Sequence, residues 1–183
     1  MSYIEVIPES EATGELAELY EKYCDKNGRV ENVLKIHSLH PKAMTSHMQL
    51  YLTAVHRSSP LTKQQREMIG ITVSRLNGCS YCVSHHTRSL KRILREDEKE
   101  TADFLAKGEP AQRLNKHDLT MLAYCEKLTR EPSAMTAADV QQLRDTGFSD
   151  RAIHDIALVV GYFCFVNRMV LALGVEIENQ FHD

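Results

Sequence analysis

The feature that most constrains this chain is a pair of amphipathic helical patterns that follow one another almost without a linker, over residues 62–94. Thr62 precedes the first pattern and Gln65 stands three residues later, which is the spacing of a capping box. Apolar residues then recur with the period of an α-helix. Asn77-Gly78 ends this helix, because glycine tolerates the left-handed conformation that helix termini often need. The pattern therefore predicts two consecutive helices, the second with Ser80 as its N-cap.

The rest of the chain shows the same helical period. After an extended arm over residues 2–8, helices are expected at 12–24, 32–40, 41–56, 100–105, 115–128, 136–145 and from 150 onward. No convincing strand pairing follows the arm. The sequence therefore predicts an all-α protein of about seven to nine helices. Aligning Thr62 with Ser149 places Cys82 on Met169, which weakly suggests an internal duplication of the helix pair that lacks the thiols.

Length and charge exclude several classes of protein. A chain of 183 residues is long enough for one domain that folds without disulfides or a metal, and its formal charge of −3 indicates neither a nucleic-acid nor an anionic-lipid partner. No apolar run reaches the roughly eighteen residues of a membrane span, and the N-terminus lacks a signal-peptide pattern. A single cytoplasmic domain over 1–183 is expected, with an N-terminal arm and helix (1–31), a core (32–100) and a C-terminal helical half (101–183).

Four reactive side chains lie close together around the helix junction: Glu67, Cys79, Cys82 and His86. Eleven residues separate Glu67 from Cys79, two separate the cysteines, and three separate Cys82 from His86. At about 100° per residue, Cys79, Cys82 and His86 fall within roughly 60° of one another on one helix face, whereas His85 points away. The positive end of the helix dipole is expected to favour a thiolate at Cys82. This arrangement predicts a redox site.

Metal binding is the main alternative for the cysteine pair. Cys79, Cys82, His85 and His86 offer two or three zinc ligands, but a structural zinc site needs four, and a second pair at ligand spacing is missing. Haem attachment requires a histidine directly after the second cysteine, where Val83 stands. Glu67 also has a simpler interpretation as an exposed helical carboxylate, and His86 as a partly buried structural imidazole.

The remaining candidate groups match no constellation. The five cysteines do not resemble a secreted disulfide framework, and three of them are expected to be buried as small hydrophobic residues: Cys24, Cys125 and Cys164. Surface or packing roles are expected for the other histidines: His37, His40, His47, His56, His117, His154 and His182. Asn167-Arg168 interrupts the apolar segment 159–175, where the charge either pairs across a subunit interface or lies at a wet edge.

The pattern E-x11-C-x2-C-x3-H resembles the core motif of the AhpD-like alkyl hydroperoxidases, a family related to the carboxymuconolactone decarboxylases. The longer segment LTKQQREMIGITVSRLNGCSYCVSHHTRSL, residues 61–90, is similar in particular to the group of peroxidase-related enzymes. A weaker resemblance extends from about Asn32 to GYFCFVNRMVLALGVEIE at 161–178. The resemblance implies the AhpD-like orthogonal helical bundle.

The resemblance also implies a role for each residue of the motif. In this family the second cysteine attacks the peroxide and the first resolves the product, so Cys82 is the expected nucleophile and Cys79 the resolving thiol. Glu67 is the expected general base, and His86 relays the proton. One departure stands out, because a histidine between the cysteines of better-studied members is Tyr81 here. This difference bears on rate and substrate preference rather than on the thiol chemistry.

The expected function is a thiol-dependent peroxidase that reduces hydrogen peroxide or alkyl hydroperoxides in antioxidant defence, without a cofactor or metal. Cys82 becomes a sulfenic acid and Cys79 closes a disulfide, which an external dithiol or thioredoxin-like protein must reduce. The resemblance implies a homo-oligomer, a trimer or hexamer. The alternatives are a general thiol–disulfide oxidoreductase or redox sensor, and a metal-binding assembly module. Carboxymuconolactone decarboxylase activity ranks last, since that chemistry does not need a cysteine pair.

Overall fold

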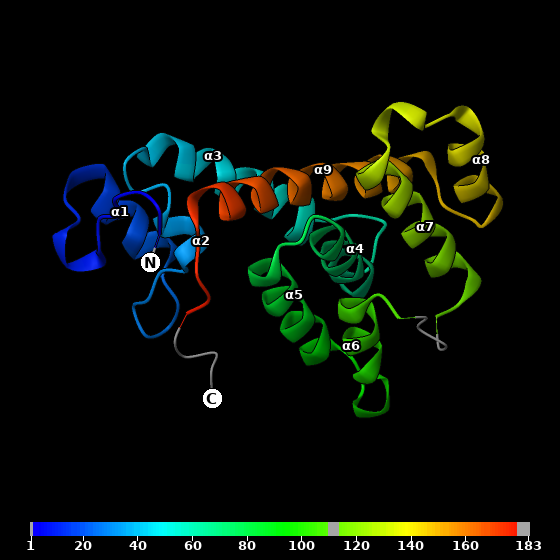
Figure 1. Ribbon diagram of the computed structural model, residues 1–183, viewed down its shortest axis with the longest axis horizontal. Helices are drawn as coiled ribbons and strands as arrows, with labels where there is room; N and C mark the ends of the chain where they lie inside the picture. Colours follow the sequence, from blue (N-terminus) through cyan, green and yellow to red (C-terminus); the bar gives the residue numbers. More distant parts are fainter. Residues whose placement is uncertain (1, 110–113, 179–183) are drawn as a thin grey trace. The chain divides into compact units, whose positions relative to one another are not determined.

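The computed structural model describes residues 2–109 and 114–178, whose regular structure is entirely helical (Figure 1). The nine α-helices of this part are α1 (Gly14–Tyr23), α2 (Asn32–Lys35), α3 (Pro41–Tyr51), α4 (Lys63–Leu76), α5 (Ser80–Ile93), α6 (Glu100–Lys107), α7 (Lys116–Arg130), α8 (Ala137–Asp145) and α9 (Asp150–Leu173). Short 3-10 turns lie at Glu9–Glu11, Glu96–Glu98 and Pro132–Ala134, and Leu52–His56 forms a π-helical turn after α3. The prediction of an all-α protein with about seven to nine helices is confirmed.

Most helix boundaries follow the signals in the sequence. The expected helix over 32–40 is shorter, since α2 ends at Lys35 and α3 begins at Pro41, where the fixed φ of proline suits a first helical turn. The sequence Gly108-Glu109-Pro110 predicts a break after α6, and Gly108, with φ of 75°, ends that helix. Pro110, the other half of that predicted break, lies outside the described residues.

Residue contacts divide the chain into two compact units, Leu52–Asn167 and a second unit made of Met1–Tyr51 and Arg168–Asp183. The predicted single domain over 1–183, with divisions after residues 31 and 100, stays a prediction. All the motif residues belong to the unit Leu52–Asn167.

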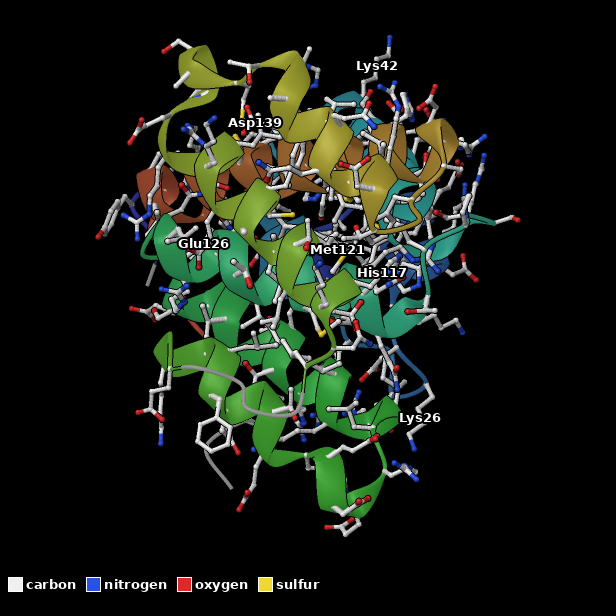
Figure 2. The ribbon with its side chains drawn as sticks, turned by 90° about the vertical axis from the view of Figure 1, so that its right-hand side faces the viewer. Lys26, Lys42, His117, Met121, Glu126 and Asp139 are labelled. Atoms are coloured by element: carbon white, nitrogen blue, oxygen red, sulfur yellow. The ribbon has the colours of Figure 1, made fainter. Side chains whose placement is uncertain are left out.

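The unit Leu52–Asn167 is built around α4, which packs against α5, α6 and α7. Ten consecutive residues of α4, 65–74, are buried, so this helix meets neighbours on all its faces. Figure 2 shows His117, Met121 and Glu126 along α7, where the Met121 side chain is fully buried. On α8, Asp139 accepts hydrogen bonds from Lys127 Nζ at 2.7 Å, which ties α8 to α7. The helix that carries Glu67 is thus held firmly in the interior.

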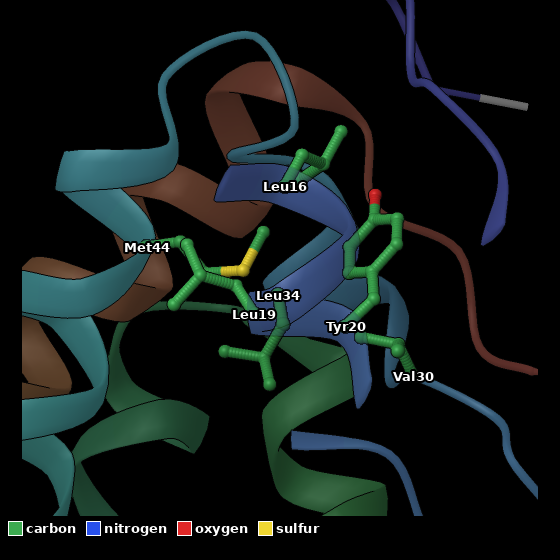
Figure 3. Close-up of a cluster of buried hydrophobic side chains, with 6 residues drawn as sticks. All are labelled: Leu16, Leu19, Tyr20, Val30, Leu34 and Met44. Atoms are coloured by element: carbon green, nitrogen blue, oxygen red, sulfur yellow. The ribbon is translucent and has the colours of Figure 1, made fainter. Parts of the chain in front are cut away.

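The second unit has its own small core. Six side chains from α1, α2, α3 and the loop between α1 and α2 pack together in Figure 3: Leu16, Leu19, Tyr20, Val30, Leu34 and Met44. The Tyr20 hydroxyl donates a hydrogen bond to the Ile7 carbonyl at 2.7 Å, and burial raises the pKa of Tyr20 to about 12. Beside this core, His37 Nε2 and His47 Nδ1 lie 2.9 Å apart, and burial lowers the pKa of both rings. This unit contains no residue of the cysteine motif.

Helix α9 differs from expectation in two respects. In the suggested duplication, Cys164 and Phe165 correspond to Asn77 and Gly78, which end α4. Cys164 and Phe165 do not break the helix, so α9 is continuous and the second helix pair does not form. By length and composition α9 could also span a membrane, the one such helix in the described residues, because an 18-residue segment of it has a mean hydropathy of 2.0. No uninterrupted apolar run reaches eighteen residues, as expected, because Asn167-Arg168 interrupts this one, but the average over the segment meets the criterion. Core helices of globular proteins meet the same criteria of length and hydropathy, and 44% of the apolar 18-residue segment of α9 is buried inside the protein.

Candidate thiol active site

The two ends of the predicted motif meet across the helix pair α4–α5. Glu67 lies on α4, and His86 lies on α5 one turn beyond Cys82. His86 Nδ1 donates a hydrogen bond to Glu67 Oε2 at 2.6 Å, and the two side chains are only 14% and 11% exposed. A bond this short between partners shielded from water is a strong, charge-assisted interaction. The interpretation of Glu67 as an exposed carboxylate is therefore wrong.

The junction between the helices is formed by local signals. Thr62 and Gln65 make both bonds of the predicted capping box at the start of α4. At its end, Asn77 is the C-cap and Gly78 has φ of 72°, as expected. The predicted N-cap of α5 is wrong by one residue, because Cys79 takes that position and its Sγ accepts the backbone N–H of Cys82 at 3.4 Å.

The position of Cys79 as the N-cap affects the pKa values of both thiols. The Cys82 thiol donates a hydrogen bond to Cys79, which lowers the pKa of Cys79, and the backbone N–H of Cys82 adds to the effect. The same shared proton, together with burial and the neighbouring negative charge, raises the pKa of Cys82. Both directions favour Cys79, at the cap where the helix N–H groups converge, as the first sulfur to lose its proton. The expectation of a thiolate at Cys82 stays a prediction.

Sequence reasoning missed one polar residue of this site. Asn167, on α9, is fully buried, and its side chain hydrogen-bonds to both sulfurs, which lowers the pKa of Cys79 and opposes the rise at Cys82. Its carboxamide also contacts Ser74 and Asn77. The available signal was a lone amide inside an apolar helix, because a buried polar group needs hydrogen-bonding partners.

Aromatic rings pack around the motif. Tyr81 is buried, and its ring stacks on His85 with centroids 4.3 Å apart, while the charge of His85 helps to lower the pKa of Cys79. The His86 ring meets the Phe163 ring nearly at a right angle, with centroids 4.6 Å apart. A Cβ on Gly70 of α4 would lie only 2.5 Å from Phe163 Cζ. Phe163 therefore fits closely between α4 and the imidazole.

Two further groups lie near Glu67. Burial lowers the pKa of His56, while the charge of Glu67 opposes that shift. Arg66 is also buried, and its Nη1 donates to the Arg57 carbonyl at 2.7 Å. Sequence reasoning assigned neither residue to the site, since periodicity alone does not show that α4 is buried on every face.

Metal ligation receives no support from geometry in the described part of the chain. No three His, Cys, Asp or Glu side chains there are placed to hold a metal ion. Of the three cysteines expected to be buried, only Cys125 is, while Cys24 and Cys164 are half-buried. The arrangement of buried thiol pair, amide donor and histidine–carboxylate pair suits proton transfer to and from sulfur.

Comparisons with known proteins identify a family match and a longer relative. Residues 41–116 match the carboxymuconolactone decarboxylase family. Human Sestrin-2 is 30% identical over 186 aligned residues, which cover 94% of this chain and 36% of Sestrin-2, so the chain spans about a third of the length of that relative.

Two solved structures share the fold. One is a peroxidase-related protein from Ralstonia eutropha described as an alkylhydroperoxidase AhpD core, with TM-score 0.88, 26% identity, and coverage of 98% of this chain and 94% of that chain. The other is a peroxidase-related protein from Silicibacter, with TM-score 0.86, 28% identity, and coverage of 99% and 94%. This chain shares its fold with the AhpD-like peroxidase-related proteins, and its residues 41–116 match the carboxymuconolactone decarboxylase family.

Proposed function

We propose that this protein is a thiol-dependent peroxidase that reduces hydrogen peroxide or alkyl hydroperoxides through Cys79 and Cys82. The observation that carries the proposal is the Glu67–His86 hydrogen bond of 2.6 Å beside a buried thiol pair. General acid–base catalysis needs such a pair close to the group that changes protonation. The peroxidase-related relatives support the same class of chemistry.

The first step prepares the nucleophile. The reduced pair releases one proton to the Glu67–His86 pair and keeps one proton between its two sulfurs. When the retained proton lies on Cys79, Cys82 carries the charge. Cys82 lies one helical turn from His86 on the same face of α5, a neighbouring position for side chains. This is the state in which Cys82 attacks.

The second step transfers oxygen. The Cys82 thiolate attacks the terminal peroxide oxygen, so that an S–O bond forms and the O–O bond breaks. The leaving alkoxide takes the proton held by His86 and departs as an alcohol, or as water when the substrate is hydrogen peroxide. Cys82 is thereby oxidised to a sulfenic acid, and the peroxide is reduced by two electrons.

The third step resolves the sulfenic acid. Cys79 attacks the Cys82 sulfur, the S–O bond breaks, and the departing hydroxide takes the Cys79 proton to form water. The backbone N–H of Cys82, which donates to Cys79 Sγ, lowers the pKa of Cys79 and suits this role, since the attacking sulfur reacts as a thiolate. An external dithiol, or a thioredoxin-like protein, returns two electrons to the Cys79–Cys82 disulfide. We further propose antioxidant defence in the cytoplasm as the setting and a homo-oligomer, trimer or hexamer, as the assembly.

Peptide mapping after a single oxidation tests the proposal. Reduced protein receives one equivalent of an organic hydroperoxide and is then alkylated and digested with trypsin. The peptide 76–88 holds both Cys79 and Cys82 and no other cysteine, so its mass reports the pair directly. The expected product is an internal disulfide in the wild type and a trappable sulfenic acid on Cys82 in Cys79→Ser.

Cys82→Ser is the matched variant, and we expect its remaining thiol in peptide 76–88 to stay reduced. A sulfenic acid on Cys79 in that variant, with none on Cys82 in Cys79→Ser, reverses the order of attack. Thiols that persist in all three proteins contradict peroxide reduction. A disulfide that forms only with oxidised glutathione, and not with peroxide, favours a general thiol–disulfide oxidoreductase.

A further inference from the structure

A fully buried carboxamide stands beside the thiol pair. Asn167 and Arg168 interrupt the apolar segment 159–175 of α9, and none of the Asn167 surface is exposed. An amide buried in an apolar interior without hydrogen bonds destabilises a protein. The hydrogen-bond partners of Asn167 therefore show which groups this buried amide stabilises.

The carboxamide is held in one orientation from two sides. Its Oδ1 accepts a hydrogen bond from Asn77 Nδ2 at 2.9 Å, and its Nδ2 donates to Ser74 Oγ at 3.1 Å. An asparagine amide has two N–H donors. The bond to Ser74 uses one donor, which leaves the second for the Cys79 and Cys82 sulfurs that this side chain also contacts.

We propose that Asn167 is a catalytic residue of the thiol site, whose second amide N–H donates to whichever sulfur of the Cys79–Cys82 pair carries negative charge. This inference rests on the proposed peroxidase function. Asn77 and Ser74 are positioning residues, because they act only by orienting the carboxamide.

Burial explains why such a donor is needed. Cys79 is fully buried and Cys82 is 3% exposed, so bulk water is not available to solvate a thiolate. A buried charge without hydrogen bonds is strongly disfavoured, and a fixed neutral donor stabilises it without an opposing charge. The donor serves Cys79 at rest and Cys82 once the shared proton has moved. In the disulfide neither sulfur is charged, so the donor is needed only in the reduced states.

The pH profile of alkylation tests this role. Reduced protein reacts with iodoacetamide from pH 5 to 10, and mass spectrometry follows the first alkylation within peptide 76–88. We expect Asn167→Leu, which keeps the branched shape and removes both donors, to alkylate at least about tenfold more slowly at pH 7, since the rate follows the thiolate fraction and one pKa unit is a factor of ten. Its profile should shift to higher pH.

Asn115→Leu is the matched control. Asn115 caps the N-terminus of α7, where its Oδ1 accepts the backbone N–H of Asp118 at 2.8 Å, so this substitution also removes a structural hydrogen bond. It should leave the alkylation profile unchanged. If the Asn115→Leu profile shifts by the same amount, the effect comes from lost stability and the proposal is wrong. The proposal is also wrong if the Asn167→Leu profile superimposes on that of the wild type.

A second variant decides the matter should Asn167→Leu not fold. Asn77→Ala removes the donor that orients Asn167 Oδ1, and we expect a smaller slowing, about threefold, with the profile shifted in the same direction. An unchanged profile in Asn77→Ala overturns the proposal in that case. Because iodoacetamide needs no peroxide, wild-type inertness toward hydroperoxides combined with a shifted Asn167→Leu profile refutes the peroxidase function and leaves the amide's role in place.

Discussion

The close approach of Gly70 and Phe163 predicts how much stability and activity the substitution Gly70→Ala removes. Gly70 lies within the buried helix α4, where an added Cβ would meet Phe163 Cζ at 2.5 Å and Cε2 at 2.8 Å. Real Cβ atoms essentially never approach so closely, and the Phe163 ring is fully buried, so the ring must move. The same ring packs edge-on against His86, so Gly70→Ala perturbs both stability and the imidazole.

Two opposing terms set the size of the effect. Alanine favours a helix over glycine by about 1 kcal/mol, while overpacking a core costs about 1–3 kcal/mol. Gly70→Ala should therefore lower the free energy of unfolding by about 0–2 kcal/mol. Gly161, on α9, is also helical, but nothing lies within 4 Å of its added Cβ. Gly161→Ala retains only the favourable term and should raise the free energy of unfolding by up to about 1 kcal/mol.

Urea denaturation of wild type, Gly70→Ala and Gly161→Ala measures these differences, and peroxide reduction by the same proteins reports on His86. We expect the two variants to differ by about 1–3 kcal/mol, with activity reduced only in Gly70→Ala. If Gly70→Ala is as stable and as active as Gly161→Ala, the close packing of Phe163 against α4 is not what holds the imidazole in place.

Three further substitutions test separate interactions. In Glu67→Gln the new amide oxygen still accepts from His86 Nδ1 but does not stabilise an imidazolium, so stopped-flow assays should show peroxide reduction about 100-fold slower, while an unchanged rate contradicts the proton role. In Cys82→Ala the pKa of Cys79, which the Cys82 hydrogen bond lowers, should rise, and the half-maximal pH for alkylation of Cys79 should move up; a shift to lower pH contradicts the assigned direction. Thr62→Ala removes half of the capping box of α4 and should destabilise the protein by about 1 kcal/mol in urea denaturation, with alkylation unaffected; no loss of stability contradicts a role for the cap.

Local signals in the sequence predicted much of the fold. Thr62, Gln65, Asn77 and Gly78 defined the start and end of α4, because caps and left-handed glycines act through neighbouring residues. The helical period likewise predicted the all-α class. The long helix expected from residue 150 onward is present as α9, whereas the weakly suggested second helix pair is not, because no breaking residue stands at Cys164–Phe165.

The sequence predicted most of the residues of the site, but not which of the two sulfurs carries the negative charge. Spacing within α5 indicated that Cys82 and His86 share a face, and family resemblance added Glu67. The charge on the sulfurs depends on whether Cys79 or Ser80 caps α5, a difference of one residue that propensity does not resolve because serine is the commoner N-cap. Asn167 comes from a helix far away in the sequence, so only the folded chain brings it to the thiols.

The most direct test of the central claim is catalytic turnover of an organic hydroperoxide with dithiothreitol as the reductant. Wild-type protein should consume many equivalents of hydroperoxide per chain, well above the rate with dithiothreitol alone, and Cys82→Ser should not. Consumption that stops after one equivalent identifies a redox sensor rather than an enzyme. Wild-type consumption no faster than dithiothreitol alone, or equal rates in wild type and Cys82→Ser, contradicts a peroxidase built on this cysteine pair.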